Sequence, residues 1–312
     1  MHPAYSVIFF TVSSGIGYGL LALMGVLAAV GLLPLEKSLG ATGMGIGFVA
    51  VSAGLLSSTF HLGRPERAWR AMTQWRTSWL SREGVVAVAT YLPVILLAYC
   101  WFYRGADART FELWALLTGL GAAGTVFCTG KIYQSLRTIH QWHNVWTVPN
   151  YLLLGLAGGA VWLLAIAGAL GFEVAHLVWV AVLSLIAAWL GKVFYWQLID
   201  NTAHAATPES ATGLGRYGQV SKFETPHTSA NYLLKEMGYH IARKHAGQLR
   251  GYAQAVGFLA PLLFIFGGVF IGHAVPYLLA AVLMTLGLVI ERWLFFAEAK
   301  HVVTLYYGAR EV

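Results

Sequence analysis

GYAQAVGFLAPLLFIFGGVFIGHAVPYLLAAVLMTLGLVI, residues 251–290, holds no Asp, Glu, Lys or Arg at any position. A helix that crosses the hydrocarbon core of a bilayer needs about 20 apolar residues, so this run is long enough for two spans. The segment GHAVP, residues 272–276, contains the glycine and proline that end one helix and start the next. The run therefore predicts spanning helices over about 252–272 and 276–297.

Six further apolar runs of spanning length precede this stretch, over about 7–33, 40–60, 84–103, 111–131, 149–171 and 174–198. The whole chain of 312 residues is 58% hydrophobic and 11% charged, whereas soluble domains carry about 25% charged residues. We therefore predict an all-α integral membrane protein, a single domain over 1–312. Its eight transmembrane helices form one bundle with both termini on the same side. Glycine pairs four residues apart favour close packing of these helices; the pairs are Gly15/Gly19, Gly43/Gly47, Gly155/Gly159 and Gly268/Gly272.

The basic residues are distributed unequally between the two ends of this predicted bundle. Only Lys37, Arg104 and Arg109 fall at the end opposite the termini, which leaves 17 of the 20 Lys and Arg residues for the terminal end. The positive-inside rule then places both termini in the cytoplasm, and the net charge of +7 is no indication of nucleic-acid binding. The loop 199–251 lies at the same end. Within it, about 230–245 predicts an amphipathic helix that either covers the bundle or docks another subunit.

The connector between the second and third helices, residues 57–84, has the sequence SSTFHLGRPERAWRAMTQWRTSWLSREG. His61 lies near the start of this connector and Glu83 near its end. His61 therefore ends the second helix and Glu83 begins the third, at the same level of the membrane. A quinone site needs a hydrogen-bond donor and a group that exchanges protons, and these two side chains can supply both. The alternative is that Glu83 pairs with a nearby arginine at the interface and that His61 only ends its helix.

Three more residues of the connector are candidates for the same site. Arg64 and Arg67 lie nearest His61 and could support a bound quinone or an acidic partner surface. Trp79 could line a flat pocket for a quinone ring. Arginines also bind lipid headgroups and set topology, and tryptophans anchor helices at membrane interfaces, so both interpretations stay open.

Other groups predict no further chemistry in this chain. The eleven histidines all fall in loops or near helix ends, so we expect no haem. Two separated cysteines, Cys100 and Cys128, make no iron–sulfur cluster. The pair His140 and His143 has no further ligand beside it, so we expect no metal site. We interpret Glu291–Arg292, near the end of the eighth helix, as a local ion pair.

The segments FHLGRPERA (60–68) and SWLSRE (78–83) resemble the membrane anchor family of dimethyl sulfoxide reductase, and the eight-helix layout agrees over essentially the whole chain. This resemblance implies an anchor subunit in a bacterial inner membrane. Its partners would be an iron–sulfur electron-transfer subunit and a molybdopterin catalytic subunit. It also implies quinol binding without haem, by a histidine and a glutamate at the positions of His61 and Glu83.

The orientation sets the chain apart from dimethyl sulfoxide reductase, whose catalytic subunits face the periplasm. The charge distribution here puts the connector face in the cytoplasm, and in this respect the chain looks more like the membrane subunit of cytoplasm-facing sulfite dehydrogenase. We therefore expect a quinone-reactive anchor of a sulfite:quinone oxidoreductase in sulfur or anaerobic respiration. The anchor would use ubiquinone or menaquinone and would itself carry out no sulfur chemistry.

Three alternatives remain. The first is a dimethyl sulfoxide reductase anchor that oxidises quinol, the second a solute permease and the third a purely structural tether. A permease typically has discontinuous helices with polar groups near the middle of the bilayer. The polar residues of this sequence lie mainly at one surface instead.

Overall fold

The structure, a computed structural model, describes residues 5–61, 64–104, 108–202, 206–224, 243–307, 309–310 and 312, without the side chains of residues 60, 61, 104 and 108. Eight of its helices are long and apolar enough to cross a membrane. They correspond one for one to the eight predicted runs, so the all-α fold class is confirmed.

The spans differ from the predicted runs mainly at their ends. The single helices are α1 Tyr5–Ala29, α2 Lys37–Ser57, α4 Ala108–Gln134, α5 Thr147–Ala169, α6 Ala175–Asn201 and α12 Val275–Ala297. Two spans contain a π-helical turn: α3 Trp79–Tyr99 continues through η3 Cys100–Arg104, and α10 Ala246–Gln254 runs through η5 Ala255–Leu259 into α11 Ala260–Ile271. Polar residues beyond the apolar runs extend several helices, so α3 begins five residues earlier than predicted and α10 six residues earlier.

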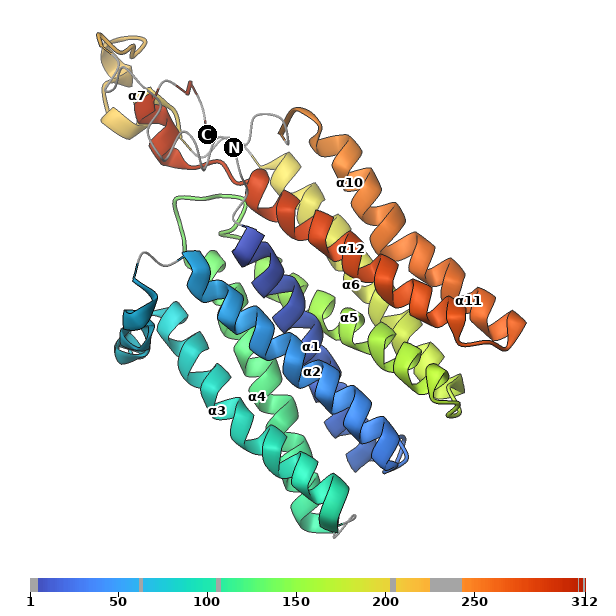
Figure 1. The fold of residues 1–312 in the computed structure, drawn as a ribbon. Helices are drawn as coiled ribbons and strands as arrows, with labels where there is room; N and C mark the ends of the chain where they lie inside the picture. The colour runs from blue at the N-terminus through green and yellow to red at the C-terminus, as the bar shows by residue number, and fades with distance from the viewer. Residues whose placement is uncertain are drawn as a thin grey trace.

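The helices form one bundle around α1 and α5, which are its most deeply buried spans. α1 packs against α2, α4, α5 and α12, while α3 packs mainly against α4. On the other side of the bundle, α5 contacts α6 and α12, and α11 contacts α12 (Figure 1). The first helix starts and the last one ends at the same end of the bundle, where the connector between α2 and α3 also lies (Figure 1).

The long loop after α6 is described only in part. It contains the short helix α7 Pro208–Thr212 and the 3₁₀ turn η4 Gly215–Tyr217. The amphipathic helix predicted at about 230–245 lies outside the described residues except for 243–245, so it stays a prediction. After α12 the chain forms η6 Val302–Tyr307, and Val312 exchanges two backbone hydrogen bonds with Ala206 of the loop.

The crossing of α1 and α5 depends on glycine. A Cβ atom built on Gly159 would overlap the backbone of Gly19 and Leu20, and one built on Gly19 would overlap the backbone of Gly155. The predicted pairs Gly15/Gly19 and Gly155/Gly159 thus face each other across the two central helices. Small residues let helix backbones approach this closely in a bilayer, where no hydrophobic force drives helices together.

We expect the substitution Gly159→Ile to lower the free energy of unfolding by about 1–3 kcal/mol, because a side chain there must separate two packed backbones. Thermal unfolding in detergent micelles measures the effect. Gly45→Ile is the matched control, since Gly45 on α2 is exposed and a Cβ there meets no atom within 4 Å. Equal melting temperatures for the two variants would contradict the prediction.

Candidate functional site

The connector between α2 and α3 is folded back onto the start of α3. It contains the 3₁₀ helices η1 Ser58–His61 and η2 Pro65–Gln74. Ser81 donates a hydrogen bond to the Ala71 carbonyl, and Met72 lies against Gly84. Arg82 donates to the carbonyls of Trp75 at 2.9 Å and Arg76 at 2.7 Å. These bonds join the connector to the first turns of α3 and fix the depth at which α3 begins.

Glu83 lies inside the bundle rather than at its rim. Ser78 caps α3, accepting a 3.4 Å hydrogen bond from the Ser81 amide, so Glu83 falls on the second turn of the helix. The Glu83 side chain is only 5% exposed. A buried carboxyl group needs a partner, and the hydroxyl of Thr129 on α4 donates to Glu83 Oε1. The same hydroxyl lies 3.1 Å from the Thr125 carbonyl, so its single proton can serve either acceptor.

Trp79 begins α3 and is half-buried. Its ring meets the edge of Phe127 on α4 at a centroid distance of 6.0 Å. Two cations lie near the ring, the Arg82 guanidinium at 4.2 Å and Lys131 Nζ at 5.6 Å from its centroid. Trp79 therefore lies beside the Glu83 turn in a basic, aromatic environment.

The other predicted site residues are placed differently. Arg64 and Arg67 are exposed, and Arg67 lies 4.0 Å from Glu66 in a surface ion pair. Among the described residues, neither guanidinium forms an ion pair with Glu83. The backbone of His61 ends η1, but its side chain lies outside the described part of the protein, so its convergence with Glu83 stays a prediction.

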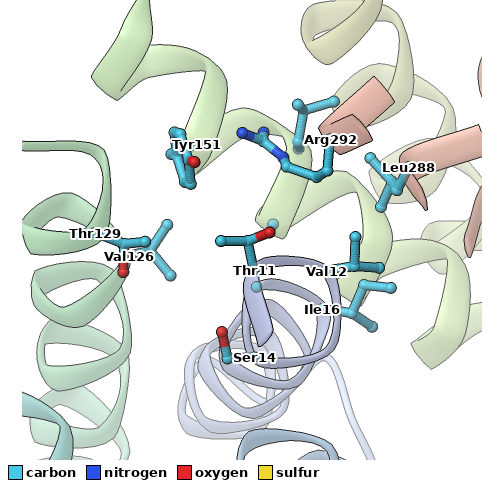
Figure 2. Close-up of a pocket in the computed structure, with 12 residues that line it drawn as sticks. Thr11, Val12, Ser14, Ile16, Val126, Thr129, Tyr151, Leu288 and Arg292 are labelled. Atoms are coloured by element: carbon cyan, nitrogen blue, oxygen red, sulfur yellow. The ribbon is translucent and has the colours of Figure 1, made fainter. Parts of the chain in front are cut away.

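Two adjoining cavities lie in this part of the bundle, and Thr129, the hydrogen-bond partner of Glu83, lines one of them. One has a volume of about 20 Å³ and is enclosed by α1, α4, α5 and α12; its polar lining includes Thr11, Ser14, Thr129, Tyr151 and Arg292 (Figure 2). That volume is sufficient for one water molecule.

The second cavity, of about 170 Å³, is almost wholly apolar and lies between α1, α4 and α5. Val126 and Gly155 line both cavities. Ala123 and Leu156, which also line the larger cavity, are exposed on the outer surface of the bundle. The polar cavity that Thr129 lines thus adjoins an apolar cavity that extends to the outer surface.

A third group of residues was not predicted as a site. Lys192 on α6 and Glu291 and Arg292 on α12 are all buried, with exposed fractions of 1%, 1% and 3%. Lys192 forms an ion pair with Glu291, and Arg292 Nε lies 3.0 Å from Glu291 Oε2. The predicted local ion pair Glu291–Arg292 is confirmed, but it is part of a larger cluster. Lys192 and Arg292 belong to the 17 basic residues assigned to the terminal end, but both lie inside the bundle. The number of basic residues assigned to the surface of that end is therefore 15.

The histidines His140 and His143 lie in the connector between α4 and α5. His143 Nδ1 lies 2.5 Å from the Gln134 carbonyl, which occupies one ring nitrogen. Burial and the neighbouring His143 lower the pKa of His140. Among the described residues, no group of three or more His, Cys, Asp or Glu side chains is placed to hold a metal ion.

Comparison with known proteins identifies the family. Residues 1–308 match the family described as DMSO reductase anchor subunit (DmsC). The protein belongs to this family. It is therefore a multi-pass integral membrane protein and an anchor subunit of a multi-subunit reductase family, in agreement with its eight spans.

Three relatives with known names are similar to this DmsC-family protein. It is 34% identical to the C subunit of sulfite dehydrogenase from Allochromatium vinosum, over 98% of its own length and 99% of the relative. It is 26% identical to the C chain of anaerobic dimethyl sulfoxide reductase from Escherichia coli, over 75% of its own length and 77% of the relative. It is 25% identical to the YnfH chain of anaerobic dimethyl sulfoxide reductase from the same organism, over 79% of its own length and 81% of the relative. No solved structure matches the protein.

Proposed function

We propose that this protein is the quinone-reactive membrane anchor of a molybdoenzyme that oxidises sulfite. In this proposal a molybdopterin subunit takes two electrons from sulfite, and an iron–sulfur subunit passes them to the anchor. A quinone at the Glu83 site then accepts two electrons and two protons and becomes quinol. The observation that carries the proposal is a buried carboxyl group whose hydrogen-bond partner, Thr129, lines a polar cavity. That cavity shares Val126 and Gly155 with an apolar cavity that extends to the outer surface of the bundle.

The chemistry of Glu83 supports a quinone more than a solute. The carboxyl group is deep enough to be shielded from water, yet the Thr129 hydroxyl can donate to its ionised form and accept from its protonated form. It can therefore exist in both states and hand a proton to a ring oxygen that is being reduced. Arg82 and Lys131, which flank the Trp79 ring, place positive charge at the adjoining surface.

The sulfite assignment is supported by the extent of similarity. The sulfite dehydrogenase relative aligns over nearly the full length of both proteins, whereas the two dimethyl sulfoxide reductase relatives align over about three quarters. The basic end of the bundle supports a cytoplasmic location of the connector and both termini. The second candidate, oxidation of quinol by an S-oxide reductase, uses the same site in the opposite direction.

Membrane vesicles that contain the whole complex test substrate, direction and orientation together. We expect sulfite to reduce added decylubiquinone or a menaquinone analogue in inverted vesicles. Sealed right-side-out vesicles should respond only after permeabilisation, because the sulfite dianion does not cross the bilayer. Ferricyanide, an acceptor that bypasses the anchor, is the control for the partner subunits.

The outcomes separate the parts of the proposal. Quinol-dependent reduction of dimethyl sulfoxide with no sulfite oxidation would replace the proposed substrate and direction but keep the quinone site. Sulfite oxidation with ferricyanide alone, and none with any quinone, would remove the quinone role itself. Activity in sealed right-side-out vesicles would reverse the proposed orientation.

A further inference from the structure

The cluster of Lys192, Glu291 and Arg292 is buried inside the bundle, five to nine residues before the ends of α12 and α6. Ionisable side chains inside a membrane are costly, and they commonly mark the routes of ions or protons. Lys192 Nζ also lies 3.9 Å from the ring centroid of Tyr195, and the Arg292 guanidinium lies 3.9 Å from that of Tyr151. The cations are thus held by aromatic faces as well as by one shared carboxylate.

The charges of these three residues do not balance among themselves. With all three groups ionised, two cations share one anion, and the three residues carry a net charge of +1; the neighbouring group of Arg250, Asp200 and Glu298 has one cation and two carboxyl groups. Arg292 cannot give up its proton in a protein, and Glu291 is enough to balance it. Lys192 is therefore the member whose loss of a proton neutralises the cluster, and a net charge is expensive in a low dielectric. The composition of the cluster thus favours proton exchange at Lys192.

On its inner side the cluster shares a cavity with the hydrogen-bond partner of Glu83, because Arg292 and Thr129 line the same small polar cavity. The guanidinium of Arg292 lies over the Tyr151 ring at one side of this cavity, and Thr129 lies farther off on the side away from Arg292 (Figure 2). Thr129 is the residue that donates a hydrogen bond to Glu83. One water molecule in this cavity would join the two charged regions.

On its outer side the cluster approaches the terminal end of the bundle. The ring of Trp196 lies between two cations, with its centroid 5.0 Å from Lys192 Nζ and 5.5 Å from the Arg250 guanidinium. Arg250 binds Asp200 through two hydrogen bonds of 2.5 and 2.9 Å and Glu298 through one of 2.6 Å.

Glu298 and Asp200 line a polar cavity of about 320 Å³ next to the loops. Burial raises the pKa of Glu298, with Arg250 acting in the opposite direction. Glu298 Oε2 has no hydrogen-bond partner among the described residues. A carboxyl group with these properties can take up a proton from water in the cavity.

We infer that Lys192 and Glu291 form a buried proton-exchange pair that serves the Glu83 site through the cavity between Tyr151 and Thr129. The inference rests on the proposed quinone function, and it applies equally to quinone reduction and to quinol oxidation. A proton enters at the cavity beside Glu298 and reaches Lys192. It then moves from Lys192 Nζ to the Glu291 carboxylate, so one N–H bond breaks and one O–H bond forms.

After that transfer Lys192 and Glu291 are both neutral, and Arg292 keeps the single positive charge of the cluster. The Glu291 proton then passes through water in the polar cavity to the Thr129 hydroxyl, which accepts it while giving its own proton to the Glu83 carboxylate. The Glu291–Arg292 pair is thereby restored. Two such passages match the two protons that a quinone takes up with two electrons from the partner subunits. Reversal of every step accounts for quinol oxidation.

Two substitutions of Lys192 in the full complex test this pair. Lys192→Arg keeps the positive charge but cannot release a proton. Lys192→Met removes the charge and leaves Glu291 and Arg292 as a balanced pair. We expect both variants to lower the maximal rate of quinone turnover at least about tenfold. We expect the quinone KM, ferricyanide turnover and assembly to stay at wild-type values, and the solvent deuterium isotope effect on quinone turnover to increase.

Lys37→Arg is the matched control, because Lys37 is exposed at the opposite end of the bundle. Quinone turnover at the wild-type rate in both Lys192 variants would overturn the inference while the quinone site stands. A slower rate with an unchanged isotope effect would also overturn it, since that result indicates a structural role. A wild-type complex without quinone turnover would reject the proposed function and this inference together.

Discussion

Replacing Glu83 by glutamine is expected to lower quinone-coupled turnover of the complex about 100-fold or more, because a positioned acid or base contributes about 10²–10⁴ to such rates. Glutamine has nearly the same shape, and its amide oxygen can still accept the hydrogen bond from Thr129. It cannot take up or release a proton. The measurement is steady-state reduction of decylubiquinone by the purified complex, with ferricyanide reduction followed in parallel.

Two further variants show whether proton exchange or packing is responsible. Thr129→Val keeps the volume of the side chain but removes the donor to Glu83, and we expect a smaller loss of about tenfold, the equivalent of one hydrogen bond. Glu112→Gln is the matched control, since Glu112 is exposed on α4 and the chemical change is identical. Wild-type quinone turnover in Glu83→Gln would contradict the assignment of the site.

The eight spans could be predicted because each apolar run is bounded by charges, loops or a glycine–proline break. Their ends could not, because polar residues extend helices beyond the membrane core. Helix α3 shows this clearly: Trp79 to Arg82 read as part of a polar connector but form its first turn. This shift carries Glu83 from the predicted rim to a buried position on the second turn.

From the sequence, only those residues of the site that lie at helix ends could be predicted. Glu83 is predictable because it opens an apolar run. Its partner Thr129 is 46 residues away, and their contact depends on how α3 packs against α4. Arg64 and Arg67 are close to His61 in the sequence, but both lie on an exposed surface of the structure. Closeness along a connector says little about which side of it faces the bundle.

The buried cluster had a detectable signal in the sequence. Lys192 is the only Lys, Arg, Asp or Glu in the predicted span 174–198, and a lone charge in a spanning helix needs a partner. Glu291 and Arg292 were recognised only as neighbours of each other. The ion pair between α6 and α12 depends on their arrangement in space, which the sequence alone does not provide.

The substitution Glu291→Gln is expected to destabilise the bundle by about 3–5 kcal/mol, the usual cost of removing one partner from a buried ion pair. It leaves Arg292, which cannot lose its proton, without a counter-charge at a position that is almost fully buried. The melting temperature of the anchor in detergent and the yield of intact complex measure the loss.

The comparison that decides the cause is with Lys192→Met, because that variant removes a charge from the same ion pair but leaves Glu291 and Arg292 balanced. If unpaired charge sets the cost, Glu291→Gln must lower the melting temperature clearly more than Lys192→Met. Glu112→Gln, the same change at an exposed position, should have almost no effect. Equal losses for Glu291→Gln and Lys192→Met would show that packing rather than charge balance holds α6 and α12 together. That result would contradict the inference that charge balance favours loss of a proton from Lys192.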